Sequence, residues 1–407
     1  YYIMQKPDSE DILSGHNLPL SSQTLVIWVV AFGMVAVSLY LGTIIFLLPD
    51  ITHWYGYYIA EWAVVLQSVV IASLFIFFGR IGDQIGLCVI FRYGLFLLGA
   101  GFVCIALIPH PYVYLFSSVL IGVASAMVSS VSGGIIRSTV PKSSFPFGIA
   151  IMYLGSSFGF IFGPSLVVLI SSFYSWNLFF LIIAPVTFLA AYLTGRICTC
   201  SRSQVSLKDI DYSGAGLLIL TCFLFMYSLV EIFKFNLSPL VFLSGLLGIL
   251  TGLFLWYHQK HSKNPFLTTG WYRVPGILHL LGLIIVLVLV YRGAVFLSRI
   301  FLQEMAYLDP IITGLILIIP GITFIPLVWL IGTYAQSWQW KQYFRVSVVG
   351  VIFGCLGAIA LGFFHQWSSI IALLLFGAYN ACIRVPICTL FFARISEEES
   401  GLAGGML

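Results

Sequence analysis

Three arginines lie in two stretches of the later chain that are otherwise apolar enough to cross a membrane. Arg292 is near the middle of one stretch, Arg299 follows it two helical turns later, and Arg384 lies in the last long stretch, near Asn380. A guanidinium at mid-membrane costs about 2.5–3.5 kcal/mol on insertion scales, so it normally faces a cavity or a partner. Arginines with aromatic neighbours suit an anionic or amphipathic substrate. The alternative is that they bond to backbone carbonyls, to a lipid phosphate or to an acid further along the natural chain.

Acidic residues are scarce in the same stretches. Of the fourteen acids in the chain, Glu61 lies within an apolar stretch, about one turn from its outer end, and Glu231 lies near the end of the seventh stretch. A proton relay needs a titratable group in the membrane whose pKa can be moved by burial and neighbours. Glu61 is therefore the candidate proton carrier. The competing interpretation is that its side chain reaches out to the membrane surface.

Membrane helices must position these side chains. The chain has 407 residues, a mean hydropathy of +1.07 and only 8% charged residues, which excludes a soluble globule because too little polar surface is available to cover one. Apolar segments of about 20 or more residues recur, each long enough for a bilayer core of about 30 Å. Twelve are predicted, over residues 24–49, 57–79, 88–109, 112–136, 145–171, 176–196, 212–232, 238–257, 275–301, 311–335, 344–364 and 367–393.

The distribution of Lys and Arg indicates which ends of the segments face the cytoplasm. The connections after the even-numbered segments hold these residues repeatedly, whereas the other connections hold only Lys234. We therefore expect a multi-pass protein of the cytoplasmic (plasma) membrane with a cytoplasmic N-terminus, surrounded by membrane lipids. The net charge of +4 reflects this asymmetry and gives no reason to expect a nucleic-acid partner.

Two long polar breaks, near residues 197–211 and 258–274, divide the chain into six segments, two segments and four. The small residues after Glu399 look like the start of a further helix, so the natural protein is expected to continue for two more spans. The expected parts are a cytoplasmic N-terminal segment, a six-helix bundle, cytoplasmic linkers with an additional helix pair, and a C-terminal bundle of four spans and the start of a fifth, at residues 1–23, 24–196, 197–274 and 275–407.

A hydrophilic segment with regularly spaced glycines follows the second apolar stretch. It has the sequence GRIGDQIG and contains Gly79, Gly82, Asp83 and Gly86. Glycines every three or four residues let two helix ends approach closely, and an acid at the start of a helix can lie on the positive end of its dipole. We expect a turn that acts as a clamp between moving helices. The alternative for Asp83 is a helix cap without a gating role.

A second small-residue pattern lies in the fifth apolar stretch. Gly155, Gly159 and Gly163 are spaced four apart on one helix face, and Pro164 follows, which can kink the helix. That face must lie against another helix. We expect this helix to be the interface at which the two halves of the molecule rock.

Both patterns resemble motifs of the major facilitator superfamily. The glycine-spaced segment is similar to its cytoplasmic loop motif G-x-L-a-D-r-x-G-r-k, with Gly79, Asp83 and Gly86 in place but without the closing basic pair. The fifth stretch resembles the antiporter motif of the fifth helix, although Val167 and Val168 stand where its last glycine pair is usual.

Further matches resemble the fourteen-helix drug:H+ antiporter family. Trp176, Asn177 and Pro185 are similar to the start of its sixth helix, and Glu398 with residues 401–404 is similar to the approach to its thirteenth. The resemblance implies an all-α polytopic membrane protein with two pseudo-symmetric helix bundles around a central site and an extra helix pair between them, the C-terminal bundle being incomplete in this chain.

The resemblance fails at the positions that would carry charge. The first-span acid of proton-coupled relatives falls, by spacing, on Tyr40, and the fourth-span arginine falls on Ser118. The second-span acid seen in some relatives is Val65 here. The matches therefore support a moving fold and leave proton coupling open.

These observations predict a secondary active transporter, a multidrug or small-molecule exporter that works by alternating access. The candidates for its cavity are Tyr40, Gln67, Arg292, Asn380 and Arg384. The alternative is a degenerate transporter-fold subunit of a larger membrane complex. No nucleophile–base pair, metal cluster or phosphate loop lies outside the apolar stretches, so neither an enzyme nor a cofactor is expected.

Overall fold

The structure is a computed structural model that describes residues 20–141, 143–198, 211–233, 238–262, 276–363, 365–395 and 399–406. The predicted N-terminal segment up to residue 19, much of the predicted linkers between 197 and 274, and Glu398 lie outside the described residues. Within the described ranges the regular elements are helices, without a strand. The predicted all-α class is therefore confirmed.

Twelve spans in the described part of the chain are long and apolar enough to cross a membrane. Lipid offers no partner for backbone N–H and C=O groups, so each span satisfies them internally as a helix. The helices are α1 (Leu20–Tyr55), α2 (Tyr57–Ile85), α3 (Leu87–Leu107), α4 (Pro111–Thr139), α5 (Phe145–Phe173), α6 (Asn177–Ile197), α7 (Tyr212–Phe233), α8 (Pro239–His261), α9 (Ile277–Ile300), α10 (Pro310–Ile316), α11 (Ile319–Tyr334), α12 (Trp340–Leu361) and α13 (Gln366–Phe392). α10 and α11 share one span, Ile312–Ser337.

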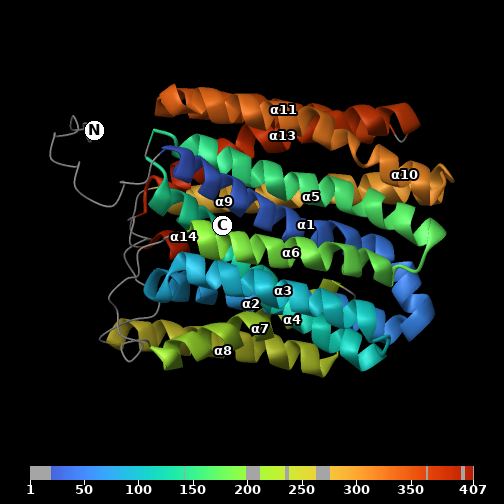
Figure 1. Cartoon of the computed structure of the whole chain (residues 1–407), viewed down its shortest axis with the longest axis horizontal. Coiled ribbons are helices and arrows are strands. Elements are labelled where there is room, and N and C mark those ends of the chain that lie inside the picture. Colours follow the sequence, from blue (N-terminus) through green and yellow to red (C-terminus); the bar gives the residue numbers. More distant parts are fainter. Residues whose placement is uncertain are drawn as a thin grey trace.

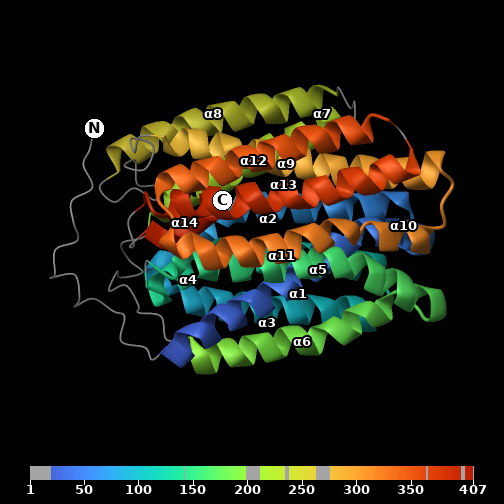
Figure 2. The same ribbon diagram turned by 90° about the horizontal axis from the view of Figure 1, so that it is seen from above.

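Three short elements follow the longer helices. A π-helical turn, η3 (Phe301–Met305), follows α9, a 3-10 turn, η4 (Ala335–Ser337), follows α11, and a short helix, α14 (Ser400–Met406), comes after α13. Figures 1 and 2 place α14 and α10 toward opposite ends of the long axis. We refer to these as the α14 end and the α10 end.

The glycine-spaced segment is not the turn that the sequence predicts. Helix α2 continues through it to Ile85, and Gly86 alone separates α2 from α3. Gly86 has a φ of 123°, a backbone conformation that side chains with a Cβ rarely adopt. Gly79, Gly82 and Asp83 therefore lie on the last turns of a helix, which fixes the direction in which Asp83 points.

The helices pack in three groups. α1 to α6 contact one another, with α1 against α5, α3 against α4 and α6, and α2 against α4; α13 contacts α9, α11 and α12. α7 and α8 pack on each other and reach the rest through α2, so this pair lies at one edge in Figures 1 and 2. We call α1–α6 the N-bundle and α9–α14 the C-group. α5 contacts α10, α11 and α13, and α14 contacts α2 and α4, so these helices form the boundary between the two.

Candidate functional site

The α14 end is closed by a carboxylate that caps a helix of the other group. The Asp83 side chain accepts hydrogen bonds from the backbone N–H groups of Gly401, at 2.6 Å, and Leu402, at 2.8 Å. Both donors are at the start of α14, where backbone N–H groups lack intrahelical partners and the helix dipole is positive. The expected interaction with a helix start is present, but the helix is α14 and not α3, which follows Asp83 in sequence.

Glycines on both sides allow this contact. A Cβ placed on Gly79 would collide with the Gly401 carbonyl, and a Cβ on Gly401 would collide with the Gly79 carbonyl. A Cβ on Gly82 would instead meet the Val131 side chain, at 2.7 Å. α2 and α14 thus approach backbone to backbone at Gly79, a contact that no larger residue permits without a shift.

Arg137 makes a second bond across the same boundary. From the last turn of α4, its guanidinium donates to the backbone carbonyls of Phe392 and Ile395, where α13 ends. The last carbonyls of a helix lack intrahelical donors and carry partial negative charge, so an arginine satisfies both needs. In the sequence, Arg137 is one of the positive charges that follow the even-numbered segments, and nothing local indicates this role because its partners lie more than 250 residues away.

The glycine face of α5 lies against α1, inside the N-bundle. A Cβ on Gly155 would meet the Ala31 backbone, and one on Gly163 would meet the Leu39 carbonyl at 2.6 Å. Gly159 lies between them on the same face, opposite Val35. Contacts of α5 with the C-group come from other residues of this helix, so the predicted rocking interface is not made by these glycines.

A cavity of ≈ 380 Å³ lies between the N-bundle and α9. Since Phe46, Pro164 and Arg299 are in the later parts of α1, α5 and α9, the cavity is nearer the α10 end than the α14 end. Its lining consists of Gly42, Phe46, Phe160, Ile161, Pro164, Tyr291, Arg292, Gly293, Val295, Phe296, Arg299 and Leu317. It combines apolar walls with two guanidinium groups.

Both arginines of the cavity lie on aromatic rings of the N-bundle. The Arg292 guanidinium carbon is 3.6 Å from the ring centre of Phe160, and that of Arg299 is 4.7 Å from the ring centre of Phe46. A desolvated cation–π contact is worth about 2 kcal/mol, somewhat less than the cost of placing an arginine at mid-membrane. The rings therefore offset part of that cost, and the ring under Arg292 does so without neutralising its charge.

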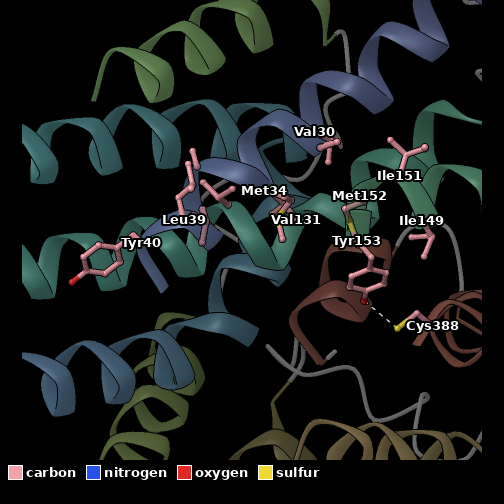
Figure 3. Packing of buried hydrophobic residues seen from close by; sticks show 14 of the residues in the cluster. Val30, Met34, Leu39, Tyr40, Val131, Ile149, Ile151, Met152, Tyr153 and Cys388 are labelled. Atoms are coloured by element: carbon pink, nitrogen blue, oxygen red, sulfur yellow. Dashed lines mark hydrogen bonds between the residues drawn. The ribbon is translucent and has the colours of Figure 1, made fainter. Parts of the chain in front are cut away.

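Arg384 repeats the arrangement on α13. Its guanidinium carbon lies 4.3 Å from the ring centre of Tyr153 of α5, and the Tyr153 hydroxyl is 3.0 Å from the Cys388 sulfur, an approach drawn as a dashed line in Figure 3. Arg384, Tyr153 and Cys388 border a second cavity of ≈ 20 Å³, room for about one water molecule. Nearby on α13, Asn380 is 2% exposed, and its side-chain oxygen has no hydrogen-bond partner among the described residues.

Tyr40 and Gln67 do not line either cavity, contrary to the prediction. Both are buried in the N-bundle, where the Tyr40 hydroxyl donates to the Gln67 side-chain oxygen at 2.8 Å and the ring packs on Phe102 and Phe180. Tyr40 is predicted for the cavity because, by spacing, it stands at the position of the first-span acid of proton-coupled relatives. A phenol bonded to an amide is neutral, and its apolar surroundings turn it inward.

Glu61 lies in the second turn of α2, near the α10 end, and its side chain is partly buried. The neighbouring Trp62 stacks on Tyr227 of α7 with ring centres 6.3 Å apart. Glu61 is thus on a helix that also meets the additional pair, and it is not part of either cavity lining. Its role as a proton carrier stays a prediction.

The sequence offers one pair of possible metal ligands, Cys198 and Cys200. Cys200 lies outside the described residues. Burial raises the pKa of the Cys198 thiol to about 12, which disfavours the thiolate that binds a metal. Among the described residues, no group of three or more His, Cys, Asp and Glu could hold a metal ion.

Comparison with known proteins gives the family. Residues 30–407 match the model of the Major Facilitator Superfamily, and the chain belongs to this superfamily. Family and fold are those of membrane transporters.

Individual relatives are distant. The chain is 24% identical over 398 residues to the multidrug resistance protein Stp of Mycobacterium tuberculosis, an alignment that covers 95% of this chain and 73% of the relative. The human organic anion transporter MFSD10 (TETRAN) has a similar structure, with a TM-score of 0.62 and 16% identity over 96% of this chain and 90% of that chain. The proton:xylose symporter XylE gives a TM-score of 0.62 and 13% identity over 95% and 85%. At these identities the two structures support the fold alone.

Proposed function

We propose that this chain is a secondary active transporter of the multidrug-efflux type, carrying an amphipathic small molecule by alternating access. One observation carries the proposal. The boundary between the N-bundle and the C-group is closed at the α14 end by Asp83 and borders a half-open cavity nearer the α10 end. A transporter that exposes one side at a time needs this combination, with a removable closure on one side and a site between the same two parts.

The finer assignments are proposals of the same kind. The matches at Trp176, Asn177 and Pro185 support the fourteen-helix drug:H+ antiporter group, and the similarity to the multidrug resistance protein Stp supports a drug exporter. The Lys and Arg distribution supports a cytoplasmic α14 end in the plasma membrane. Gly79, Gly82, Asp83 and Gly86 are then part of the cytoplasmic gate, while Gly155, Gly159, Gly163 and Pro164 hold α5 against α1 so that the N-bundle moves as one body. The four parts predicted at 1–23, 24–196, 197–274 and 275–407 describe this proposed domain division.

The test of this function is Asp83→Asn, which keeps the size of the side chain and removes its charge. Hydrogen bonds to a charged group are worth about 1.5–3 kcal/mol, so closure at the α14 end weakens and substrate transport into proteoliposomes falls by about tenfold or more. Asp50→Asn is the matched control, since Asp50 lies on α1 away from the closure. Equal transport by the wild type and Asp83→Asn contradicts the proposed gate.

Proton coupling is tested separately at Glu61. If Glu61 carries the proton, Glu61→Gln abolishes uptake driven by a pH gradient and leaves exchange of substrate for substrate in place. The neutral Tyr40–Gln67 pair stands where the resemblance places the acid of the first span, so Glu61 is the candidate tested here. Unchanged pH-driven uptake removes Glu61 from the mechanism.

The second candidate function is a transporter-fold subunit of a larger membrane complex. The observation in its favour is the same neutral Tyr40–Gln67 pair, since a structural subunit needs no coupling residue. Native purification followed by mass spectrometry separates the two functions. A transporter is recovered alone or as a small homo-oligomer, whereas constant stoichiometric partners favour the subunit.

A further inference from the structure

Arg292 presents donors that the protein does not use. Its described contact is the stack on Phe160, and among the described residues it makes neither a hydrogen bond nor an ion pair. A stacked ring covers only the face of a guanidinium, while its five N–H donors point outward in the plane. These donors are available on the wall of the cavity, where a planar carboxylate can accept two of them at once.

The surroundings of Arg292 are positive as well. Arg384, a second arginine at the boundary, is partly buried and likewise lies on an aromatic ring, that of Tyr153, without a carboxylate partner among the described residues. A cation–π contact stabilises the arginine but leaves its positive charge in place, because an aromatic ring has a quadrupole and no net charge. A negative ligand supplies the missing charge, whereas a cationic ligand would face repulsion from both arginines.

The rest of the cavity is apolar and limits the size of the ligand. Phe46, Phe296 and Val295 form walls beside Arg292. Ligand pockets commonly measure about 300–1,000 Å³, so ≈ 380 Å³ is near the lower end. This volume fits a compact molecule of one or two rings.

We propose that this cavity binds a compact amphipathic organic carboxylate, with the carboxylate on the in-plane donors of Arg292 and the apolar body against Phe46 and Phe296. Phe160 is a positioning residue that holds the guanidinium plane so that its edge faces the cavity. The inference rests on the proposed transport function, because it identifies the chemical class of the substrate for the same cavity. It adds a charge requirement that a general multidrug site lacks.

Three probes with one body and different charge test the class: 1-naphthaleneacetate, 1-naphthaleneacetamide and 1-naphthylethylamine. Binding to the purified full chain in nanodiscs of phosphatidylcholine is measured by titration calorimetry. We expect 1-naphthaleneacetate (the acetate below) to bind about tenfold or more tighter than the amide, because charge-assisted hydrogen bonds are about twice as strong as neutral ones. The amine is expected to bind weakest. Equal binding of acetate and amide, tighter binding of the amine, or no acetate binding by folded protein overturns the proposal.

Variants locate the site. Arg292→Gln is expected to lose about tenfold in acetate affinity and to keep its affinity for the amide, while Arg345→Gln, the same change on an exposed arginine of α12, alters neither. Phe160→Leu keeps the charge and is expected to weaken acetate binding about threefold through a less ordered guanidinium. Arg292→Lys keeps the charge but loses the paired donors, so it tests the same point if Arg292→Gln fails to fold. Unchanged acetate binding in folded Arg292→Lys and Phe160→Leu overturns the assignment to Arg292.

Two further arms separate the possible outcomes. Nanodiscs with phosphatidylglycerol test whether an anionic lipid headgroup is the natural occupant, and loss of acetate binding there overturns the small-molecule inference in favour of lipid. Transport of neutral or cationic drugs without any acetate preference overturns this inference alone. If the protein binds 1-naphthaleneacetate but transports nothing, the proposed function is overturned and the proposed binding site stands.

Discussion

The two sides of the boundary between the N-bundle and the C-group are held by different physics. At the α14 end, the Asp83 carboxylate and the Arg137 guanidinium bond to backbone groups at helix ends, and glycines bring the backbones into contact. Around the cavity, arginines rest on aromatic rings. Hydrogen bonds to helix ends require one geometry and break as a unit, whereas ring contacts tolerate sliding and leave donors for a ligand. The first arrangement suits a gate and the second suits a binding site.

The largest effect is expected from Gly79→Val at the gate. The new side chain would meet the Gly401 carbonyl, which is backbone and cannot move aside, so closure at the α14 end is lost. Overpacking of this kind costs about 1–3 kcal/mol, which predicts a fall in transport of about tenfold or more. Gly216→Val is the control, because nothing lies within 4 Å of a Cβ at Gly216. Wild-type transport by a folded Gly79→Val protein would show that this contact does not form during transport.

Arg137→Gln comes next. It replaces two charge-assisted bonds to the Phe392 and Ile395 carbonyls by at most a weaker one, and transport is expected to fall about fivefold to tenfold. Transport and thermal stability are measured together, with Arg345→Gln as the control for loss of a positive charge. A fall in stability with full activity of the folded fraction would make Arg137 a structural residue and weaken the comparison.

The smallest effect is expected from Phe46→Leu at the cavity. Leucine keeps an apolar wall and removes the ring under Arg299, a contact worth about 0.5–1 kcal/mol where it is solvated. The apparent KM for transport is expected to rise about twofold to fivefold with little change in maximal rate. Phe116→Leu, on the exposed face of α4, serves as the control. A fall of tenfold or more in maximal rate would place Phe46 in a gate and remove the distinction between the two sides.

The sequence predicts the spans and the family well because both depend on local signals. A membrane helix must be long and apolar, so the twelve spans are readable from hydropathy. The loop motif is read from the spacing of Gly79, Asp83 and Gly86. Its partner is not readable, because Gly401 is 318 residues from Asp83 and no local pattern connects them.

The arginine contacts show the same limit. The sequence indicates that Arg292 and Arg384 need partners, and it directs the search to anions, acids and carbonyls. The partners found are Phe160 and Tyr153, which belong to α5 and look like ordinary core residues in sequence. For Tyr40 the prediction is wrong for a different reason. Its spacing along the first span suggests the cavity, whereas its hydrogen bond to Gln67 holds it inside the N-bundle.

The central claim is that the two ends of this boundary open in alternation. Spin labels at positions 138 and 393 report the distance across the α14 end, and labels at 174 and 307 report it across the α10 end, in a background that lacks reactive cysteines. Distances are measured by pulsed electron resonance in the Asp83 and Asp83→Asn proteins. The account predicts that Asp83→Asn lengthens the 138–393 distance and shortens the 174–307 distance. Unchanged distances, or both distances lengthening together, would contradict it.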